Sequence, residues 1–344
     1  MSNVLVTGGA GFIGSHLAED LMRRGHDVVV VDDLSGGAKD NLPAGARFVE
    51  GSINDVDLVN RLFSRERFRF VYHLAAYAAE GLSHFIKRFN YNNNLIGSVN
   101  LINASVNSSV ECFVFASSIA VYGTSLDLPL TEETPPSPED SYGIAKLAVE
   151  QELRSCKEMF DLDYIVFRPH NVYGERQNIG DKYRNVVGIF MNQILQGKPM
   201  TVFGDGSQTR AFSYIDDVAP VIAGSVETPD AYNQIFNIGA DEAYSVEELA
   251  RCVARAMGVQ PEILYAPARN EVAHAYSSHQ KVRDVFGLQP PTSLEEGLIR
   301  MARWAESHGA RSSREFDGIE ISKNFPAAWE PHTDDSEEVE ERIA

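Results

Sequence analysis

The feature that most constrains the fold is a glycine-rich stretch at residues 4–14. A short apolar run enters the sequence Thr-Gly-Gly-Ala-Gly-Phe-Ile-Gly, and apolar residues then recur at helical spacing. This pattern predicts a strand, a tight turn and a helix. In such a unit Gly8 suits a turn that a Cβ would block, Gly11 lets the backbone approach a pyrophosphate, and Gly14 lets the helix pack close to the strand. The free N–H groups at the start of the helix then face the phosphates.

A second strand is predicted at residues 28–31, where four consecutive valines end in Asp32. An acidic residue about 20 positions after the glycines holds the adenosine ribose hydroxyls of a dinucleotide in folds of this kind. Because a carboxylate repels a 2′-phosphate, NAD is favoured over NADP. The alternative is that Asp32 only begins a turn with Asp33 and residues 35–37.

The glycines are spaced Gly-x-x-Gly-x-x-Gly. With the residues around them, they resemble the extended short-chain dehydrogenase/reductase family, most of all its nucleotide-sugar epimerases and dehydratases. The resemblance implies an NAD cofactor held by the glycine turn and by the ends of the following strands. Ser52 stands where the family usually has an Asp on the adenine, and Asn94 could equally belong to an ordinary polar helix face. The expected cofactor contacts are Gly8, Gly11, Phe12, Ile13, Gly14, Asp32, Asp33, Ser52, Ile53, Leu74, Ala75, Ala76, Asn94, Ser117, Tyr142 and Lys146.

The overall composition limits which partners the protein can bind. The 344 residues carry a net charge of −19 at pH 7, which would repel nucleic acid and anionic lipid. An anionic substrate therefore needs a local cluster of Arg or Lys. The three cysteines lie far apart without a metal-binding spacing, which indicates free thiols in a reducing compartment and predicts no metal site. No signal peptide and no uncharged apolar run of membrane-spanning length is found, so the sequence predicts a soluble cytoplasmic protein.

Strands and helices alternate along the first half of the chain. This alternation predicts a doubly wound α/β fold of the Rossmann type, with a parallel sheet covered on both faces and ligands at the carboxyl ends of its strands. Further strands are expected at residues 48–51, 70–74, 111–116 and within 165–174, and helices at residues 55–63, 85–106 and 141–160.

Three parts of the chain are expected from these patterns. Residues 1–176 form an NAD-binding domain, and residues 177–310 form a smaller α/β substrate lobe, from which some strands can return to the first domain. Residues 311–344 form a tail that is partly disordered, because residues 334–342 are mostly acidic.

Two segments carry the residues that point to catalysis. Ser117 and Ser118 close the fifth strand, and Tyr142 and Lys146 lie four apart at the start of the next helix, so they share a helix face. A phenol has a pKa of about 10 and is a poor base at neutral pH, but a nearby ammonium and the positive nicotinamide ring favour the phenolate. Tyr142 can then exchange a proton with a sugar hydroxyl while Ser118 shares the hydrogen bond. This set matches the catalytic triad of the family, and the alternative is an ordinary surface pair.

The residues after Ser118 bear on the type of reaction. In the 4,6-dehydratases and uronate decarboxylases of the family, an acidic residue follows the catalytic serine or threonine. Here Ile119 and Ala120 follow Ser118, and this difference favours epimerisation. No cysteine lies near Tyr142 in sequence, which is a smaller argument against a 3,5-epimerase.

The second half of the chain carries the expected substrate contacts. The resemblance implies that Asn171 and two arginines bind the diphosphate of a nucleotide sugar, and that Phe203 lies against its base. An arginine suits this role because its planar fork of N–H donors matches a phosphate, although either arginine could instead form a salt bridge. His170 is interpreted as a packed histidine rather than as a base. The predicted substrate-binding residues are Ser118, Tyr142, Asn171, Phe203, Arg210 and Arg269.

The sequence therefore predicts an NAD-dependent epimerase that inverts C4 of a UDP-sugar of the UDP-glucose/UDP-galactose type through a transient 4-keto intermediate. A dehydratase or decarboxylase of the same family and a non-catalytic NAD-sensing or scaffold protein are the alternatives. The helices at residues 85–106 and 141–160 resemble the pair that forms the dimer interface in the family, so a homodimer is expected. The sugar itself stays open, because residues 78–81 and 178–183, which would shape its pocket, match no pattern.

Overall fold

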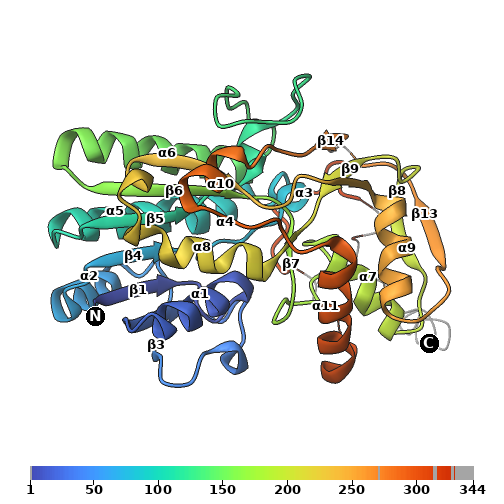
Figure 1. Cartoon of the computed structure of the whole chain (residues 1–344), viewed down its shortest axis with the longest axis horizontal. Helices are drawn as coiled ribbons and strands as arrows, with labels where there is room; N and C mark the ends of the chain where they lie inside the picture. The colour runs from blue at the N-terminus through green and yellow to red at the C-terminus, as the bar shows by residue number, and fades with distance from the viewer. Residues whose placement is uncertain (1, 270–271, 313–315, 327–328, 330–344) are drawn as a thin grey trace, which may run out of the picture.

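A seven-stranded sheet lies at the centre of the molecule. The computed structural model describes residues 2–269, 272–312, 316–326 and 329. The strands of the sheet are β1 (Asn3–Thr7), β2 (Asp27–Asp32), β3 (Arg47–Glu50), β4 (Phe70–His73), β5 (Cys112–Ala116), β6 (Asp163–Pro169) and β11 (Gln234–Ile238). Their order is β11-β6-β5-β4-β1-β2-β3 and every pairing is parallel, which confirms the predicted fold class (Figure 1).

Helices cover both faces of this sheet, as its apolar strands require. The valines of β2 and all four residues of β4 are buried, because a parallel sheet between two helical layers has no solvent-facing side. Figure 1 shows the two layers on opposite sides of the strands. One layer contains α2 (Val56–Glu66), α5 (Gly97–Asn107) and α6 (Ser141–Phe160), and the other contains α1 (Phe12–Arg23), α8 (Ala219–Gly224) and α10 (Gln280–Phe286).

The helix expected at residues 85–106 is interrupted. After the short α3 (Glu80–Ser83), the chain forms α4 (Lys87–Tyr91), then a π-helical turn, η2 (Asn92–Ile96), and then α5. Within this wider turn the amide of Asn94 accepts a hydrogen bond from the N–H of Tyr77 at 2.8 Å and donates one to the carbonyl of Tyr77 at 3.1 Å. The helix therefore fixes the chain that leaves β4, and π-turns of this kind occur mostly at functional sites.

A smaller lobe follows β6 and lies to the right of the sheet in Figure 1. Its helices are α7 (Val186–Leu195), α9 (Val246–Ala256) and α11 (Leu294–His308). Its strands are β8 (Met200–Phe203) with β13 (Ile263–Ala266), β9 (Thr209–Ala211) with β12 (Ala243–Ser245) and β14 (His274–Ala275), and β7 (Val172–Tyr173) with β10 (Ser213–Tyr214).

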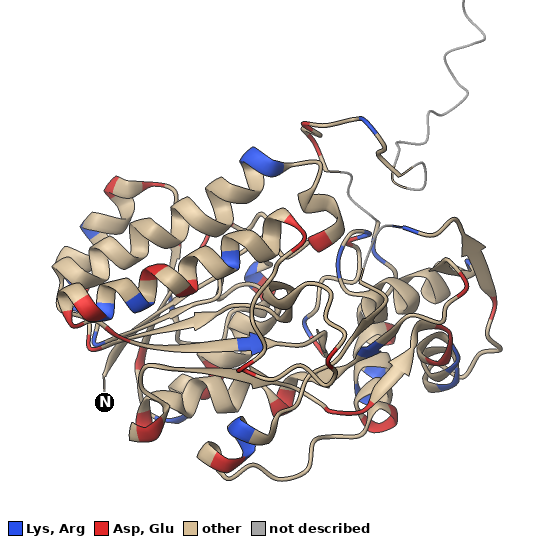
Figure 2. Cartoon of the chain, turned by 90° about the horizontal axis from the view of Figure 1, so that it is seen from above, with Lys and Arg blue, Asp and Glu red and all other residues tan. Residues whose placement is uncertain are grey.

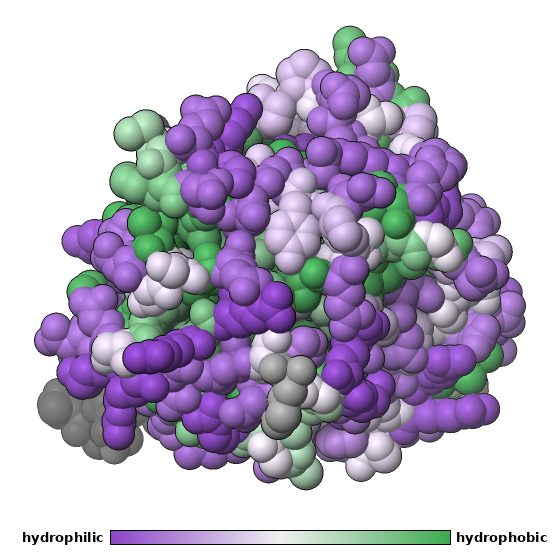
Figure 3. Space-filling model, turned by 60° about the vertical axis from the view of Figure 1, so that its left-hand side comes forward, coloured by the Kyte–Doolittle hydropathy of each residue, from purple (hydrophilic) through white to green (hydrophobic). Residues whose placement is uncertain are grey.

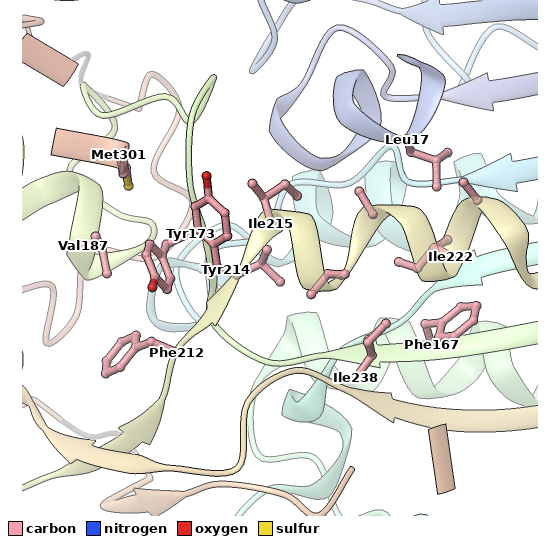
Figure 4. Packing of buried hydrophobic residues seen from close by; sticks show 14 of the residues in the cluster. Leu17, Phe167, Tyr173, Val187, Phe212, Tyr214, Ile215, Ile222, Ile238 and Met301 are labelled. Carbon is pink, nitrogen blue, oxygen red and sulfur yellow. The ribbon is translucent and has the colours of Figure 1, made fainter. Parts of the chain in front are cut away.

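The sheet and the smaller lobe share one apolar core. β11, which comes from within residues 177–310, lies beside β6 as the edge strand of the central sheet. The core runs without a break from Leu17 and Phe167 at the sheet to Val187 and Met301 in the lobe (Figure 4). The lobe is therefore held to the sheet by packed side chains as well as by the chain that connects them.

Acidic and basic side chains are spread over the surface helices and loops (Figure 2), and the face in Figure 3 is mostly hydrophilic with smaller apolar areas. Among the described residues, no helix combines the length and the apolar character needed to cross a membrane. The acidic segment expected to be disordered, residues 334–342, lies outside the described residues.

The short 3₁₀ helices are η1 (Lys39–Asn41), η3 (Ile119–Tyr122), η4 (Ile215–Asp217), η5 (Ser225–Glu227) and η6 (Pro229–Ala231).

Candidate active site

A large cavity of about 1770 Å³ lies at the carboxyl ends of the central strands, between the sheet and the smaller lobe. Nearly all of the predicted site residues line it, although they come from distant parts of the chain. These residues are Gly8, Gly11, Phe12, Ile13, Gly14, Asp32, Asp33, Ser52, Ile53, Leu74, Ala75, Ala76, Ser117, Ser118, Tyr142, Lys146, Asn171, Phe203, Arg210 and Arg269.

The glycine turn forms one end of this cavity. Gly8 has a φ of +71°, and a Cβ on it would lie 2.7 Å from the backbone nitrogen of Ala75. A Cβ on Gly14 would lie 2.1 Å from the carbonyl oxygen of Gly8. Both positions require glycine, because a side chain at either would collide with the backbone of the neighbouring turn or strand end. This close packing leaves the N–H groups at the start of α1 facing the cavity, where a pyrophosphate can approach them. The turn therefore fits a dinucleotide.

Asp32 ends β2 beside this turn. Its two carboxylate oxygens accept hydrogen bonds from the N–H groups of Ala10 at 3.0 Å and Leu34 at 2.8 Å. Burial raises the pKa of Asp32, and these two hydrogen bonds oppose the rise. Each carboxylate oxygen retains a lone pair that can accept a ribose hydroxyl, so the side chain fits the ribose as well as the turn.

Asn94 is the one predicted cofactor residue that does not line the cavity. Its side chain is buried, and its amide is fully engaged with the backbone of Tyr77 and with Asn90. Asn94 therefore acts on the chain after β4, and its direct contact with a cofactor stays a prediction. Asn90, Asn94 and Ser98 are buried at a spacing of four residues, so they share the helix face that points inward.

The residues expected to be catalytic meet at the carboxyl end of β5. Asp140 begins α6 by accepting a hydrogen bond from the N–H of Gly143 at 2.8 Å, and this start places Tyr142 in the cavity wall. The Ser118 side chain lies near the Tyr142 hydroxyl and acts to lower the pKa of that phenol. Lys146 donates to the carbonyl of Ala116 at 2.7 Å, and its Nζ lies 5.7 Å from the centre of the Tyr142 ring. The structure thus brings all three side chains into one cluster.

Burial dominates the electrostatics of this cluster. Burial raises the pKa of Tyr142, and the carboxylate of Glu80 adds to the rise, whereas the Ser118 side chain opposes it. Burial also lowers the pKa of Lys146 to about 7, which the carboxylate of Glu150 opposes. In the absence of other charges the phenol therefore keeps its proton, so a further positive charge in the cavity is needed to favour the phenolate at neutral pH.

A buried ion pair between β6 and α6 lies next to this cluster and supports it. The sequence analysis did not identify this pair. The guanidinium of Arg168 on β6 donates to both carboxylate oxygens of Glu150 on α6, at 2.9 and 2.6 Å, and to the Tyr122 hydroxyl at 2.7 Å. The Ser117 hydroxyl donates to the same carboxylate at 2.5 Å. A signal was present, since Glu150 lies four residues after Lys146 and Arg168 interrupts an apolar strand.

The predicted substrate residues form the opposite end of the cavity. The guanidinium of Arg269 lies 3.8 Å from the centre of the Phe203 ring. Arg210 donates to the backbone carbonyls of Thr209 at 2.8 Å and Ala273 at 2.9 Å, and also to that of Val272. Two guanidinium groups therefore lie at this end, as an anionic ligand requires.

Asn171 and His170 lie where β6 leaves the sheet. The Asn171 amide donates to the carbonyl of Ala211 at 3.1 Å, and the backbone of Asn171 has a φ of +37°. His170 is fully buried, and burial together with the neighbouring His279 and Arg210 lowers its pKa to about 3. A neutral, enclosed ring agrees with the interpretation of His170 as a packed histidine.

Arg184 is a second residue that the sequence analysis did not identify. Its guanidinium lies over the Tyr77 ring, 4.9 Å from the ring centre, and forms an ion pair with Asp181 at 2.6 Å. One of its nitrogens lies 3.3 Å from the position that a Cβ on Gly36 would occupy. The smaller lobe therefore places a cation beside the loop after β2. Among the described residues, no group of acidic, histidine and cysteine side chains is arranged to hold a metal ion.

Comparisons with known proteins agree with this geometry. Residues 4–239 match the model of the "NAD dependent epimerase/dehydratase family". The UDP-glucose 4-epimerase of Thermotoga maritima, solved with UDP-glucose, is 36% identical with a TM-score of 0.85, over 89% of this chain and 99% of that chain. The UDP-glucose 4-epimerase of Thermus thermophilus, solved with NAD, is 34% identical with a TM-score of 0.82, over 88% of this chain and 98% of that chain.

Relatives of similar identity act on other sugars. The UDP-N-acetylglucosamine 4-epimerase of Methanobrevibacter ruminantium is 30% identical with a TM-score of 0.83, over 89% of this chain and 99% of that chain. The chain thus shares its fold and most of its length with NAD-dependent epimerases that differ in substrate. We conclude that it is an enzyme of the NAD-dependent epimerase/dehydratase family and one of its nucleotide-sugar epimerases.

Proposed function

We propose that this enzyme inverts C4 of a UDP-sugar of the UDP-glucose/UDP-galactose type through a transient 4-keto intermediate. The observation that carries the proposal is the cluster at the end of β5. There the Tyr142 hydroxyl lies near Ser118 and the Tyr142 ring lies near Lys146, whereas apolar residues follow Ser118 in place of an acid. This arrangement suits reversible proton exchange with a hydroxyl and lacks the neighbouring acid that elimination of water needs.

In the proposed reaction Tyr142 acts as the general base. Its phenolate takes the proton of the C4 hydroxyl while Ser118 holds the same oxygen, and Lys146 stabilises the phenolate charge. NAD held by the glycine turn and Asp32 would supply reversible hydride transfer at C4. Tyr142 then gives the proton back to the oxygen. The overall reaction involves no net oxidation or reduction, because the proton and the hydride that leave the sugar both return to it.

We place the NAD between the glycine turn and Asp32. Asp32 accepts the ribose hydroxyls of the adenosine, which excludes a 2′-phosphate at the same position. Ser52 and Ile53 contact the adenine, and Leu74, Ala75 and Ala76 leave room for the nicotinamide half. Arg184 supplies the positive charge opposite the turn. Its contacts with Gly36 and Tyr77 support this role, because these residues flank the space in front of the turn.

The nucleotide of the substrate is assigned to the smaller lobe. Phe203 packs against the uracil, and Arg210, Arg269 and Asn171 bind the diphosphate. The proximity of Arg269 to Phe203 supports this assignment, since base and diphosphate are adjacent in a nucleotide sugar.

We also retain the expectation of a cytoplasmic location.

A homodimer through η2, α5 and α6 completes the proposal. These helices pack side by side, and large apolar side chains stay exposed on them, at Ile96, Ile144, Met159 and Phe160. Neither face of the sheet needs these side chains for its own packing, so a second copy of the same surface is the partner that would bury them.

Incubation with a panel of UDP-, dTDP- and GDP-sugars tests the activity. Epimerisation converts UDP-glucose into UDP-galactose without a change in mass, and chromatography separates the two. A product that has lost water or carbon dioxide would assign the enzyme to the dehydratases or decarboxylases instead. Binding of NAD without turnover of any sugar would support a sensor or scaffold.

A further inference from the structure

The chain after α11 returns to the cavity and forms part of its wall. We call residues 316–326 and 329 the tail segment. The elements from β1 to α11 occupy residues 3–308, about nine-tenths of the chain. The aligned epimerase structures likewise match 88–89% of this chain over 98–99% of their own length. The match is thus accounted for without the tail segment.

Glu320 anchors the tail segment to the start of α4. Its two carboxylate oxygens accept hydrogen bonds from the backbone N–H groups of Arg88 and Phe89, at 2.8 and 2.9 Å. The N–H groups of Glu320 and Ile321 in turn donate to the carbonyl of Phe85, at 2.9 and 3.1 Å. Backbone N–H groups in the first turn of a helix have no partner within the helix. The Glu320 carboxylate accepts hydrogen bonds from two of them, so the tail segment is attached to α4 at a defined position.

Aromatic packing extends the attachment on both sides of Glu320. Phe316 lies 4.8 Å from Phe89 and 5.4 Å from Tyr77, measured between ring centres, and Phe325 lies 5.1 Å from Phe85. Such edge-to-face contacts stabilise a packed arrangement beyond the area that they bury. The tail segment is therefore held by a separate small core against α3 and α4.

Trp329 is the largest of the tail-segment side chains that line the cavity, with Ile321, Lys323, Asn324 and Pro326. Its indole packs against Gly81, where an added Cβ would lie 3.1 Å from the ring. The centre of the indole lies 5.3 Å from the centre of the Tyr183 ring. The Lys182 ammonium donates to the Trp329 carbonyl at 3.4 Å. Gly81 and Tyr183 belong to the two stretches, 78–81 and 178–183, that were expected to shape the sugar pocket. Trp329 joins them and lines the same cavity.

The position of this wall relates it to the sugar rather than to the nucleotide. Gly81 lies on α3, whose Ser83 hydroxyl accepts a hydrogen bond from the backbone N–H of Tyr142 at 3.2 Å. On its other side, Trp329 lies 5.3 Å from the Arg269 guanidinium, which has its closer contact on Phe203. The indole thus lies between the reacting hydroxyl and the diphosphate site, where a nucleotide sugar carries its hexose.

We propose that Trp329 is a specificity-determining residue that forms the wall of the hexose pocket, and that Glu320 holds it in place. This inference rests on the proposed function, because it assumes that a UDP-hexose occupies the cavity. An apolar ring supplied at this point contacts the C–H face of a hexose and limits the room for larger substituents.

The test compares binding of UDP-glucose with binding of UDP by calorimetry, using the NAD-containing full chain. In Trp329→Ala the Kd of UDP-glucose should rise by about tenfold or more, because the loss of the apolar contact at the hexose removes that much affinity. The Kd of UDP, which has no hexose, should change far less, because Arg269 keeps its closer contact on Phe203 when the indole is removed. Glu320→Gln, which leaves the indole intact, should show the same pattern with a smaller change.

Trp304→Ala is the matched control. Trp304 is the other tryptophan of the chain and packs on α11 against His308, outside the cavity lining. This variant should bind both ligands like the wild type. Equal weakening of UDP and UDP-glucose by Trp329→Ala, or no weakening of either, would overturn the assignment of Trp329. Failure of the wild-type enzyme to bind UDP-glucose would instead overturn the proposed function.

Discussion

Arg168 and Glu150 form a two-point ion pair in which both side chains are only 2% exposed. Removing one member leaves a buried charge without its partner, which typically costs about 3–5 kcal/mol of stability. We therefore expect Arg168→Leu to lower the free energy of unfolding by about this amount, as measured by urea denaturation. The double variant Arg168→Leu, Glu150→Leu should recover part of the loss, since it leaves neither charge behind. A single variant as stable as the wild type would contradict this account.

Tyr142→Phe should remove the proton acceptor and leave the ring packing intact. General acid–base groups contribute roughly 10²–10⁴-fold in rate, so kcat should fall by at least about 10²-fold, whereas the NAD content and the Kd of UDP-glucose should stay close to those of the wild type. Turnover is followed by chromatography of UDP-glucose and UDP-galactose. Retention of near-full activity would contradict the assignment of Tyr142 as the base.

Two charges near Tyr142 should shift the pH dependence of the rate in opposite directions. The carboxylate of Glu80 raises the pKa of Tyr142, so Glu80→Gln should lower that pKa and move the acidic limb of the pH–rate profile to lower pH. The Lys146 ammonium stabilises the phenolate, so Lys146→Ala should slow turnover and move the same limb to higher pH. Shifts in the same direction for both variants would refute the assignment of Tyr142 as the titrating base.

Asp32 should determine the choice between NAD and NADP. In Asp32→Asn the carboxylate no longer repels a 2′-phosphate, so the affinity for NADP should rise by about tenfold or more, while NAD binding weakens because a charged acceptor is lost. Calorimetry on protein freed of cofactor measures both. If the wild type already bound NADP as tightly as NAD, the role given to Asp32 would be incorrect.

The proposed dimer can be disrupted at one residue. Ile96 on η2 is 49% exposed, and Ile96→Glu would place charges against each other across a two-fold interface. We expect this variant to sediment as a monomer at micromolar concentration, whereas the wild type sediments as a dimer. Leu264→Glu is the control, because Leu264 is similarly exposed but lies on β13, away from these helices. A monomeric wild type would exclude the dimer.

Sequence patterns were most informative where function depends on neighbouring residues. The glycine turn, Asp32 and the Tyr142–Lys146 spacing are local patterns, and each lies in the cavity wall as expected. Glu150 and Arg168 each stand out in the sequence, but their pairing could not be predicted, because it depends on which strand lies beside β5. Trp329 and Gly81 are separated by most of the chain, and no periodicity connects them. The contact of Asn94 with Tyr77 could not be predicted either, because it depends on how the chain after β4 runs past the helix.

The position of β11 has a consequence for the synthesis of the protein. When the ribosome has completed β6, the partner of that strand, β11, is still about 70 residues from being finished, and at about 5–20 residues per second it follows roughly 4–14 s later. During this interval β6 is an apolar strand with an open edge, the kind of edge that pairs with other chains. The nascent chain therefore has its greatest need of a chaperone between these two strands, well before the smaller lobe is complete.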